Sequence, residues 1–377
     1  MQSIDVRPLA LLALVSLSAG CSSSRSITGP IIIGDQVAYV LTSDFSTGGL
    51  SVIDLATHQV ATNVASVHSD ASLRVHGGLI YVVNRFGQDN IQVIDPNRRY
   101  ATRRQFSTGN GSNPQDIAFA SQAKAYVSRY ASADLLIVDP RSGIQLGTIS
   151  LAAFADGDGI PEMDQMAIVG SILFVACQRL TNFSAANPSV VVVIDTRTDE
   201  LVDRDFAIPG VQGIALTGRN PLTDFAYDAT AQQLLIGCVG AYGVTDGGIE
   251  RIDVAGMRSL GYAITEAALG GDVLDVAWNG REHSYAIVSD ASFNTTLVGW
   301  NARSGAVVDT VYAPGGFSLP DCEVNGLGEL YACNNSLTAP GVWVFGAVAA
   351  DTVDAGLDTL IAGPLDTGLP PVRIAFP

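Results

Sequence analysis

The chain has 377 residues, a formal net charge of −17 and a sequence pI of about 4.4. This acidic balance argues against nucleic acid as a partner, because phosphate backbones are recognised by basic surfaces. Lys124 is the only lysine, so the sequence has no lysine cluster for anionic lipid. Hydrophobic residues make up 47% of the chain, enough for a sizeable core.

The first predicted element is an export signal over residues 1–20. Arg7 precedes the apolar run 9–15, which is too short to cross a bilayer. The letters LSAGC, ending at Cys21, resemble the cleavage box of bacterial lipoproteins, in which the cysteine is lipidated and becomes the new N-terminus. The resemblance implies a lipid bilayer as partner, reached through Cys21 and a tether over 21–35, and a location at the bacterial cell envelope. An ordinary cleaved signal is the alternative.

Seven copies of a two-part pattern follow the tether. Each copy opens on an aromatic or apolar residue followed mostly by β-branched residues, as in YVL 39–41, YVV 81–83, YVS 126–128, FVA 174–176, LIG 235–237, YAI 285–287 and YAC 331–333. A second apolar segment follows each opening segment, as in SVID 51–54, IQVID 91–95, LLIVD 135–139, VVVID 191–195, IERID 249–253, LVGWN 297–301 and VWVFG 342–346. Short segments of this composition, bounded by Gly, Asn, Asp or Pro, are typical of β-strands.

Two further segments complete each unit. DIAF 116–119, DFAY 224–227 and DVAW 275–278 precede the opening segment, and IQLGTI 144–149 is one of the strands that follow the turn. Four strands in about 40–60 residues predict an all-β fold, the β-propeller.

The two ends of the repeat region fit together. The first unit lacks its opening strand, and VRIAF 372–376 has the missing pattern. We therefore predict one domain over residues 36–377: a seven-bladed β-propeller with four antiparallel strands per blade, whose C-terminal strand completes blade one. This pairing would remove two exposed sheet edges.

The stretch NPQDIAFASQAKAYVSRYASADLLIVDPRSG at 113–143 resembles the YVTN-repeat β-propeller family of bacterial exported proteins. The resemblance covers about residues 36–377. It implies the propeller fold and an exported setting, but no single activity.

Charged residues recur on one predicted face of the ring. In a propeller, the loops before the first strand and between the second and third strands surround one end of the channel. The candidate ligand face comprises Arg85, Arg129, Arg179, Asp116, Asp224, Asp275, Asp321 and Arg373. Arginine forks suit a carboxylate or phosphate on a small molecule or partner protein. The alternative is that these charges pair with one another across blades.

An acidic stretch, ADGDGIPEMDQM at 155–166, leads into blade four. Its candidate calcium ligands are Asp156, Asp158, Glu162 and Asp164. The spacing departs from the EF-hand, because Pro161 stands at position six where glycine is required. The alternative, which we favour, is an acidic rim loop that pairs with Arg129 and Arg179.

Four cysteines follow Cys21, and we expect different states for two pairs of them. Cys322 and Cys333 lie on adjacent predicted strands, and we expect a cross-strand disulfide between them. Cys177 and Cys238 occupy equivalent places in neighbouring blades, and we expect buried thiols.

These patterns favour an envelope-anchored binding or scaffold module over an enzyme. No nucleophile motif is present, and calcium is the one candidate cofactor. The alternative function is a metal-dependent hydrolase or lactonase, with a divalent ion held by the channel aspartates.

Overall fold

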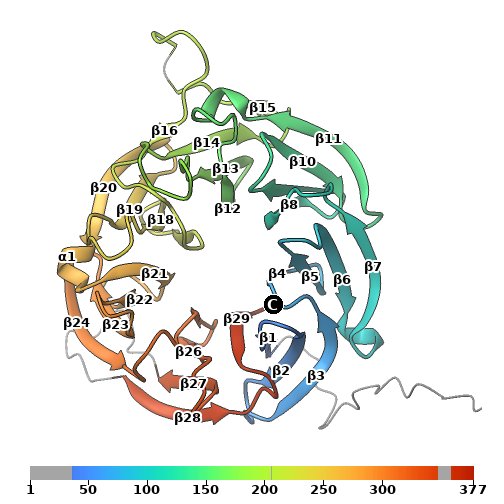
Figure 1. Cartoon of the computed structure of the whole chain (residues 1–377), viewed down its shortest axis with the longest axis vertical. Helices are drawn as coiled ribbons and strands as arrows, with labels where there is room; N and C mark the ends of the chain where they lie inside the picture. The colour runs from blue at the N-terminus through green and yellow to red at the C-terminus, as the bar shows by residue number, and fades with distance from the viewer. Residues whose placement is uncertain (1–35, 205, 347–357) are drawn as a thin grey trace, which may run out of the picture.

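The structure is a computed structural model that describes residues 36–204, 206–346 and 358–377. Seven antiparallel sheets form a ring (Figure 1), which confirms the predicted seven-bladed β-propeller. The predicted signal peptide, Cys21 and the tether lie outside the described residues. Within the described ranges, no helix has the length and hydrophobicity needed to span a membrane.

The strands follow one another in blade order. Blade 1 consists of β29 (Pro371–Ala375), β1 (Val37–Ser43), β2 (Gly48–Asp54) and β3 (Val60–Val67). Blade 2 consists of β4 (Ala71–His76), β5 (Leu79–Asn84), β6 (Asn90–Asp95) and β7 (Ala101–Ser107). Blade 3 consists of β8 (Pro114–Ser121), β9 (Lys124–Arg129), β10 (Asp134–Asp139) and β11 (Ile144–Ser150). Blade 4 consists of β12 (Met163–Val169), β13 (Ile172–Cys177), β14 (Val190–Asp195) and β15 (Glu200–Leu201), with β16 (Ile214–Ala215) also paired to β14.

The last three blades keep the same order. Blade 5 consists of β17 (Ala226–Asp228), β18 (Gln233–Cys238), β19 (Gly248–Asp253) and β20 (Arg258–Thr265). Blade 6 consists of β21 (Asp272–Ala277), β22 (Ser284–Ser289), β23 (Thr295–Asn301) and β24 (Ala306–Tyr312). Blade 7 consists of β25 (Asp321–Val324), β26 (Glu329–Asn334), β27 (Gly341–Gly346) and β28 (Thr359–Leu365). The described helices are short, namely η1 (Pro96–Arg98), η2 (Ala152–Phe154) and α1 (Glu266–Leu269).

The ring closes as the sequence predicts. The C-terminal strand β29 pairs with β1, with Tyr39 opposite Ala375 and Val40 opposite Ile374. Figure 1 shows β29, in red, beside β1, in blue. Because β29 completes blade 1, the inner edge of β1 is paired at the seam.

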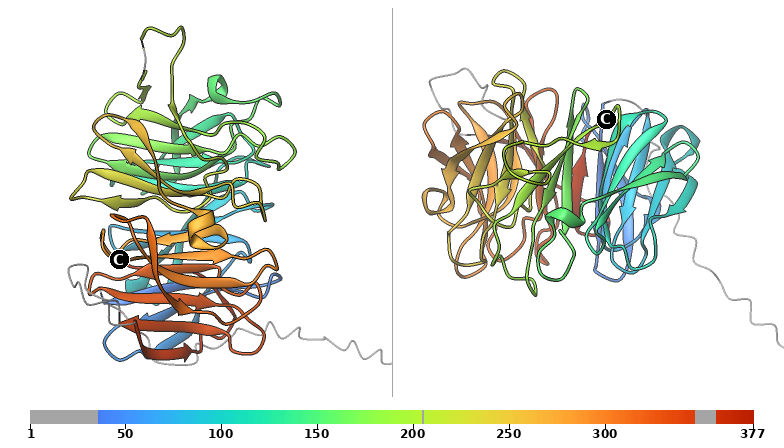
Figure 2. Two further views of the ribbon diagram at one scale, coloured as in Figure 1. Left: turned by 90° about the vertical axis from the view of Figure 1, so that its left-hand side faces the viewer. Right: turned by 90° about the horizontal axis from the view of Figure 1, so that it is seen from above.

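The core is divided among the seven blade interfaces. Side chains alternate along each inner strand, so Ile80 and Val82 pack toward blade 1 while Tyr81 and Val83 pack toward blade 3. Both faces of an inner strand are therefore buried, which explains why these segments read as continuous apolar runs. Figure 2 shows the ring from the side, with the connecting loops gathered on its two faces.

The predicted disulfide is wrong. In the β25–β26 register, Cys322 lies opposite Ala332 and Asp321 lies opposite Cys333. A one-residue offset places the two side chains on opposite faces of the sheet. Cys322 packs between blades 6 and 7, and Cys333 packs between blades 7 and 1. The four cysteines of the described region are all free and buried, as expected for Cys177 and Cys238.

Candidate functional site

The mouth of the channel is built by a repeated backbone contact. Residues that precede the first strand adopt left-handed conformations in three successive blades: Asn113, Glu162 and Asn220 have φ of 46°, 47° and 53°. Asparagine tolerates this conformation better than most residues. Each carbonyl oxygen accepts a hydrogen bond of 3.0–3.1 Å from the loop between strands two and three of its own blade, from the N–H of Tyr130, Gln178 and Val239 respectively. These bonds fix both sets of loops around the channel.

The predicted aspartates connect neighbouring blades. Asp116 accepts a hydrogen bond from the N–H of Met166 in the next blade, at 2.9 Å. The same contact recurs from the N–H of Cys322 to Asp275 at 2.8 Å, and from the N–H of Ile374 to Asp321 at 2.7 Å. A carboxylate at this position of the first strand therefore joins two inner strands that share no sheet.

Arg74 contacts three other blades in the channel, a role that was not predicted from the sequence. Its Nε lies 2.7 Å from Asp116 Oδ1, its Nη1 lies 2.6 Å from Asp224 Oδ2, and its Nη2 donates to Gln165 Oε1 at 2.9 Å. One guanidinium from blade 2 thus bridges blades 3, 4 and 5. The sequence did contain one indication of this role, because Arg74 is a charged residue inside the otherwise strand-like segment SLRV at 72–75.

A second arginine neutralises the other side of the channel. Arg373 Nη1 lies 3.1 Å from Asp321 Oδ1 and 3.6 Å from Asp224 Oδ1. Although burial opposes the effect, Arg74 and Arg373 hold the pKa of Asp224 well below its usual range. Pairing across blades is therefore the arrangement found for Asp116, Asp224 and Asp321.

Other channel acids have the opposite character, among them Asp321, whose pKa is raised by burial although it contacts Arg373. Burial raises the pKa of Asp275 to about 6, and burial also raises the pKa of Glu323 well above its usual range. Nearby carboxylates, including Asp224, add to both shifts. Protonation of Asp275 below about pH 6 lowers the charge repulsion within the channel.

A cavity of about 460 Å³ opens at the mouth, above these charges. Amide and aromatic side chains line much of it, including Asn113, Asn220, Gln178, Tyr130 and Tyr242. The Oδ1 atoms of Asn113 and Asn220 are buried and have no hydrogen-bond partner. Burial, followed by nearby acids, raises the pKa of Tyr130 to about 12, so its hydroxyl remains a donor at neutral pH. Tyr242 is 56% exposed, leaving a face of the ring open.

The three arginines predicted for the ligand face have different positions. Arg85 lines the cavity, where Asp70 holds its guanidinium and Nη1 donates to Gln115 Oε1 at 3.2 Å. Arg129 instead donates to the main-chain oxygen of Asp134 from Nε at 2.9 Å. Arg179 Nη1 donates to the carbonyl of Pro188 at 2.8 Å. The last two side chains brace loops instead of presenting their charge to a ligand.

The acidic stretch 155–166 is also satisfied locally. Asp156 Oδ2 accepts hydrogen bonds from Thr181 Oγ1 at 2.8 Å and Asn187 Nδ2 at 2.6 Å. Asp158 Oδ1 accepts from the N–H of Ile160 at 2.8 Å. Neutral donors therefore hold these two carboxylates, and the favoured ion pairs with Arg129 and Arg179 are not formed.

The other two acids of this stretch lie deeper. Glu162 Oε2 accepts a 3.0 Å bond from the N–H of Leu180, and Asp164 Oδ2 accepts a 2.6 Å bond from Gln178 Nε2. Burial raises the pKa of each carboxyl to about 7. The four predicted calcium ligands do not converge. Within the described ranges, side chains converge in a metal-like group elsewhere, at His283, Asp309 and Asp358.

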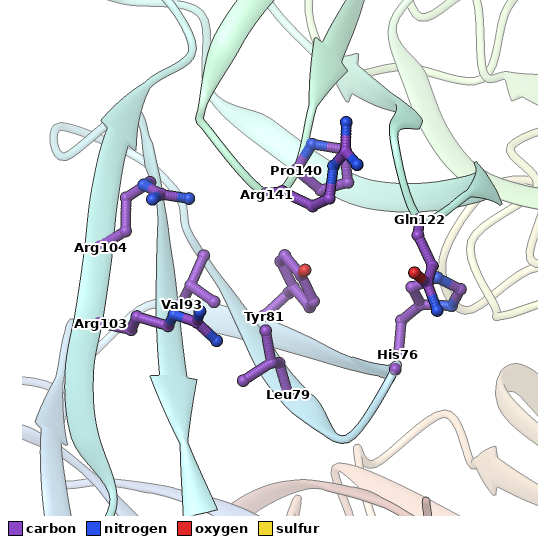
Figure 3. A pocket seen from close by; sticks show the side chains of 10 residues that line it. His76, Leu79, Tyr81, Val93, Arg103, Arg104, Gln122, Pro140 and Arg141 are labelled. Atoms are coloured by element: carbon purple, nitrogen blue, oxygen red, sulfur yellow. The ribbon is translucent and has the colours of Figure 1, made fainter. Parts of the chain in front are cut away.

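A second cavity, of about 280 Å³, lies between blades 2 and 3 (Figure 3). Arg103, Arg104 and Arg141 surround Tyr81 there. The β6–β7 register shifts so that Val93 lies opposite Arg104 and Ile94 opposite Thr102, leaving Arg103 as a bulge residue. A bulge re-aims side chains, which explains how two adjacent arginines reach one pocket. Arg141 pairs with Asp139 at 3.0 Å and Arg103 lies 3.9 Å from Asp95, so acids offset much of this positive charge.

The comparisons with known proteins define the fold alone. No family model matches the chain, and no curated protein matches it. The family resemblance therefore rests on the sequence pattern. Among solved structures, hydrazine synthase of Kuenenia stuttgartiensis is 16% identical, with a TM-score of 0.58 over 81% of this chain and 90% of that chain. A putative 6-phosphogluconolactonase of Bacteroides fragilis is 13% identical, with a TM-score of 0.57 over 90% and 97%. Dihydro-heme d1 dehydrogenase in complex with DHE is 11% identical, with a TM-score of 0.53 over 91% and 75%.

Proposed function

We propose that this protein is a binding module whose ligand occupies the mouth cavity, and that the ligand is a small, uncharged, hydroxyl-rich molecule. The observation that carries the proposal is the pair of buried, unpartnered acceptors, Asn113 Oδ1 and Asn220 Oδ1. Buried acceptors are costly when they remain unsatisfied. A small rotation of each side-chain amide toward the cavity would let a ligand with several hydroxyl donors supply the missing hydrogen bonds.

The surroundings of these acceptors support a neutral ligand. The cavity volume of about 460 Å³ falls in the range of small-molecule sites. Tyr130 and Tyr242 offer flat apolar faces beside the polar amides, a combination that suits a sugar ring. Arg85 and Arg373 are engaged by Asp70 and Asp321, so the lining offers an anion little uncompensated charge.

The alternative of a hydrolase or lactonase with an ion in the channel receives less support. Two of its candidate ligands, Asp116 and Asp224, form ion pairs of 2.7 and 2.6 Å with Arg74. A guanidinium at this position competes with a cation by charge repulsion and by occupying the same oxygens. The lactonase-like structure is similar in fold only and assigns no reaction to this chain.

The binding proposal is tested by calorimetric titration with neutral mono- and disaccharides, alongside sugar acids of the same size. Asn220→Gly removes one acceptor without straining the left-handed backbone, and Tyr242→Ala removes one ring. We expect each variant to weaken binding of a neutral sugar about tenfold, the loss of roughly one good contact. Gln232→Gly is the matched control, because Gln232 has φ of 57° and lies in the β17–β18 turn.

The proposal is contradicted if no neutral sugar binds, or if the variants bind like the wild type. Preferential binding of the sugar acids would also contradict it. Turnover of a lactone that requires added divalent metal would instead support the alternative enzyme.

We further propose that the propeller is held at the cell envelope by lipidation of Cys21. The support is the LSAGC pattern followed by a short polar segment. Several acyl chains would give stable attachment where one is marginal. Cys21→Ala should move the protein from the membrane fraction to the soluble fraction, and unchanged fractionation would refute the anchor.

A further inference from the structure

Three chemistry-bearing side chains meet far from the mouth, where blade 6 contacts blade 7. His283 precedes β22, Asp309 lies on the outer strand β24, and Asp358 precedes β28. Loops that join first to second and third to fourth strands lie on the face opposite the mouth. The group is therefore separate from the proposed ligand cavity, and its members come from two different blades.

The geometry suits a common ligand atom. His283 Nε2 lies 3.1 Å from Asp358 Oδ2 and 3.9 Å from Asp309 Oδ1, and the ligating atoms all lie within 4.8 Å of one another. Donors about 2.1 Å from one ion at a tetrahedral angle are about 3.4 Å apart. The three side chains are 4%, 8% and 0% exposed in the order His283, Asp309, Asp358. Modest rotamer adjustment would centre a small cation among them.

An unpartnered buried atom points into this group. Asp309 Oδ1 is buried and forms no hydrogen bond. A carboxylate left in this state is costly unless a cation or proton compensates it.

Gly299, on the neighbouring strand β23, leaves room for His283 and Asp309. A Cβ on Gly299 would lie 2.1 Å from Asp309 Oδ1 and 2.7 Å from His283 Nε2, so only glycine permits this packing. Behind the site, Tyr285 donates its hydroxyl hydrogen to Asp358 Oδ1 at 3.0 Å, which orients the carboxylate. Hydrogen bonds of this kind commonly fix metal-ligating carboxylates.

We propose that His283, Asp309 and Asp358 bind one divalent cation of the borderline class, with Zn²⁺ as the preferred ion, and that this ion joins blade 6 to blade 7. Zinc accepts imidazole nitrogen and carboxylate oxygen at about 2.0–2.2 Å in four-coordinate sites. Calcium requires six to eight oxygen ligands, which one imidazole and two carboxylates do not supply. A water molecule would complete the four-coordinate set.

The test measures metal content and thermal stability of the purified propeller. Metal analysis should find about one equivalent of zinc or manganese after exposure and desalting. In chelator-stripped protein, saturating Zn²⁺ should raise the Tm by about 5 °C, whereas Ca²⁺ and Mg²⁺ should not. Asp309→Asn preserves the shape and should abolish the shift. Asp290→Asn is the control in the same blade, because Asp290 is exposed and caps a turn.

Three outcomes would overturn the proposal. The wild type could retain no metal and show no Tm shift, calcium could stabilise it as well as zinc, or Asp309→Asn could bind zinc with wild-type affinity. The first two are measured on the wild type alone, so they decide the question even if the variant fails to fold.

Discussion

Replacing Arg74 by methionine tests the channel architecture most directly. Methionine approximates the apolar stem of arginine but removes ion pairs of 2.7 and 2.6 Å with Asp116 and Asp224 and the 2.9 Å hydrogen bond to Gln165. The partner carboxylates are 3% and 14% exposed, so water cannot fully replace the guanidinium. Removing one partner of a buried pair costs about 3–5 kcal/mol. For a domain of this size, we expect a Tm decrease of about 4–7 °C at neutral pH.

The pH dependence gives a sharper signature. The folded-state pKa of Asp224 is lowered, so the stability that its pairing contributes is present above the ordinary carboxyl pKa and is lost as pH falls through the folded value. The Arg74→Met deficit should therefore be largest near pH 7 and shrink toward pH 3. Adding Asp224→Asn should recover part of the loss, because it removes one of the two carboxylates that lose Arg74 as a partner.

Denaturant unfolding followed by tryptophan fluorescence measures these differences, since Trp300 is fully buried. Arg141→Met is the control, because Arg141 is 62% exposed and its pair with Asp139 should contribute less than about 1 kcal/mol. A deficit below about 1 kcal/mol for Arg74→Met, or an equal deficit at pH 3 and pH 7, would refute the assignment of Arg74 as the buried bridge of the channel.

Three further predictions follow from the same structure. Alkylation of the denatured, unreduced propeller should modify all four cysteines, Cys177, Cys238, Cys322 and Cys333, as detected by mass spectrometry. If only two of them are modified, a disulfide is present after all. Glu162→Gln should raise stability at pH 8 by about 3 kcal/mol and change it little at pH 4, because burial raises the folded pKa to about 7 and the wild type loses stability as pH rises from 4.5 to 7. Equal melting curves for the two proteins at pH 8 would contradict this. Deleting residues 371–377 removes β29 and opens the edge of β1, so the truncated protein should aggregate or unfold; a monomer with wild-type Tm would show that ring closure is dispensable.

The architecture could be predicted from the sequence alone, because each blade repeats the same local pattern of strand and turn residues. Short apolar segments, turn residues and the matching C-terminal VRIAF segment predicted the blades and their closure. The structure confirms both, since strand identity depends on neighbouring residues and on hydrophobic pattern. At the mouth, Asn113 and Asn220 adopt the left-handed conformation, which asparagine tolerates better than most residues.

Only the tertiary structure decided which charged groups meet. Arg74 reaches three other blades, and His283 meets Asp309 and Asp358 across a blade boundary; no local pattern encodes contacts over such separations. The predicted pairing of Arg129 and Arg179 with the acidic stretch failed because nearby neutral donors satisfy those acids. The predicted disulfide failed by one residue of register, which reverses the face of a strand. The hydrophobic pattern of the sequence thus predicted the strands, whereas the contacts within the channel and at the proposed metal site depend on side-chain direction and on the geometry of the ring.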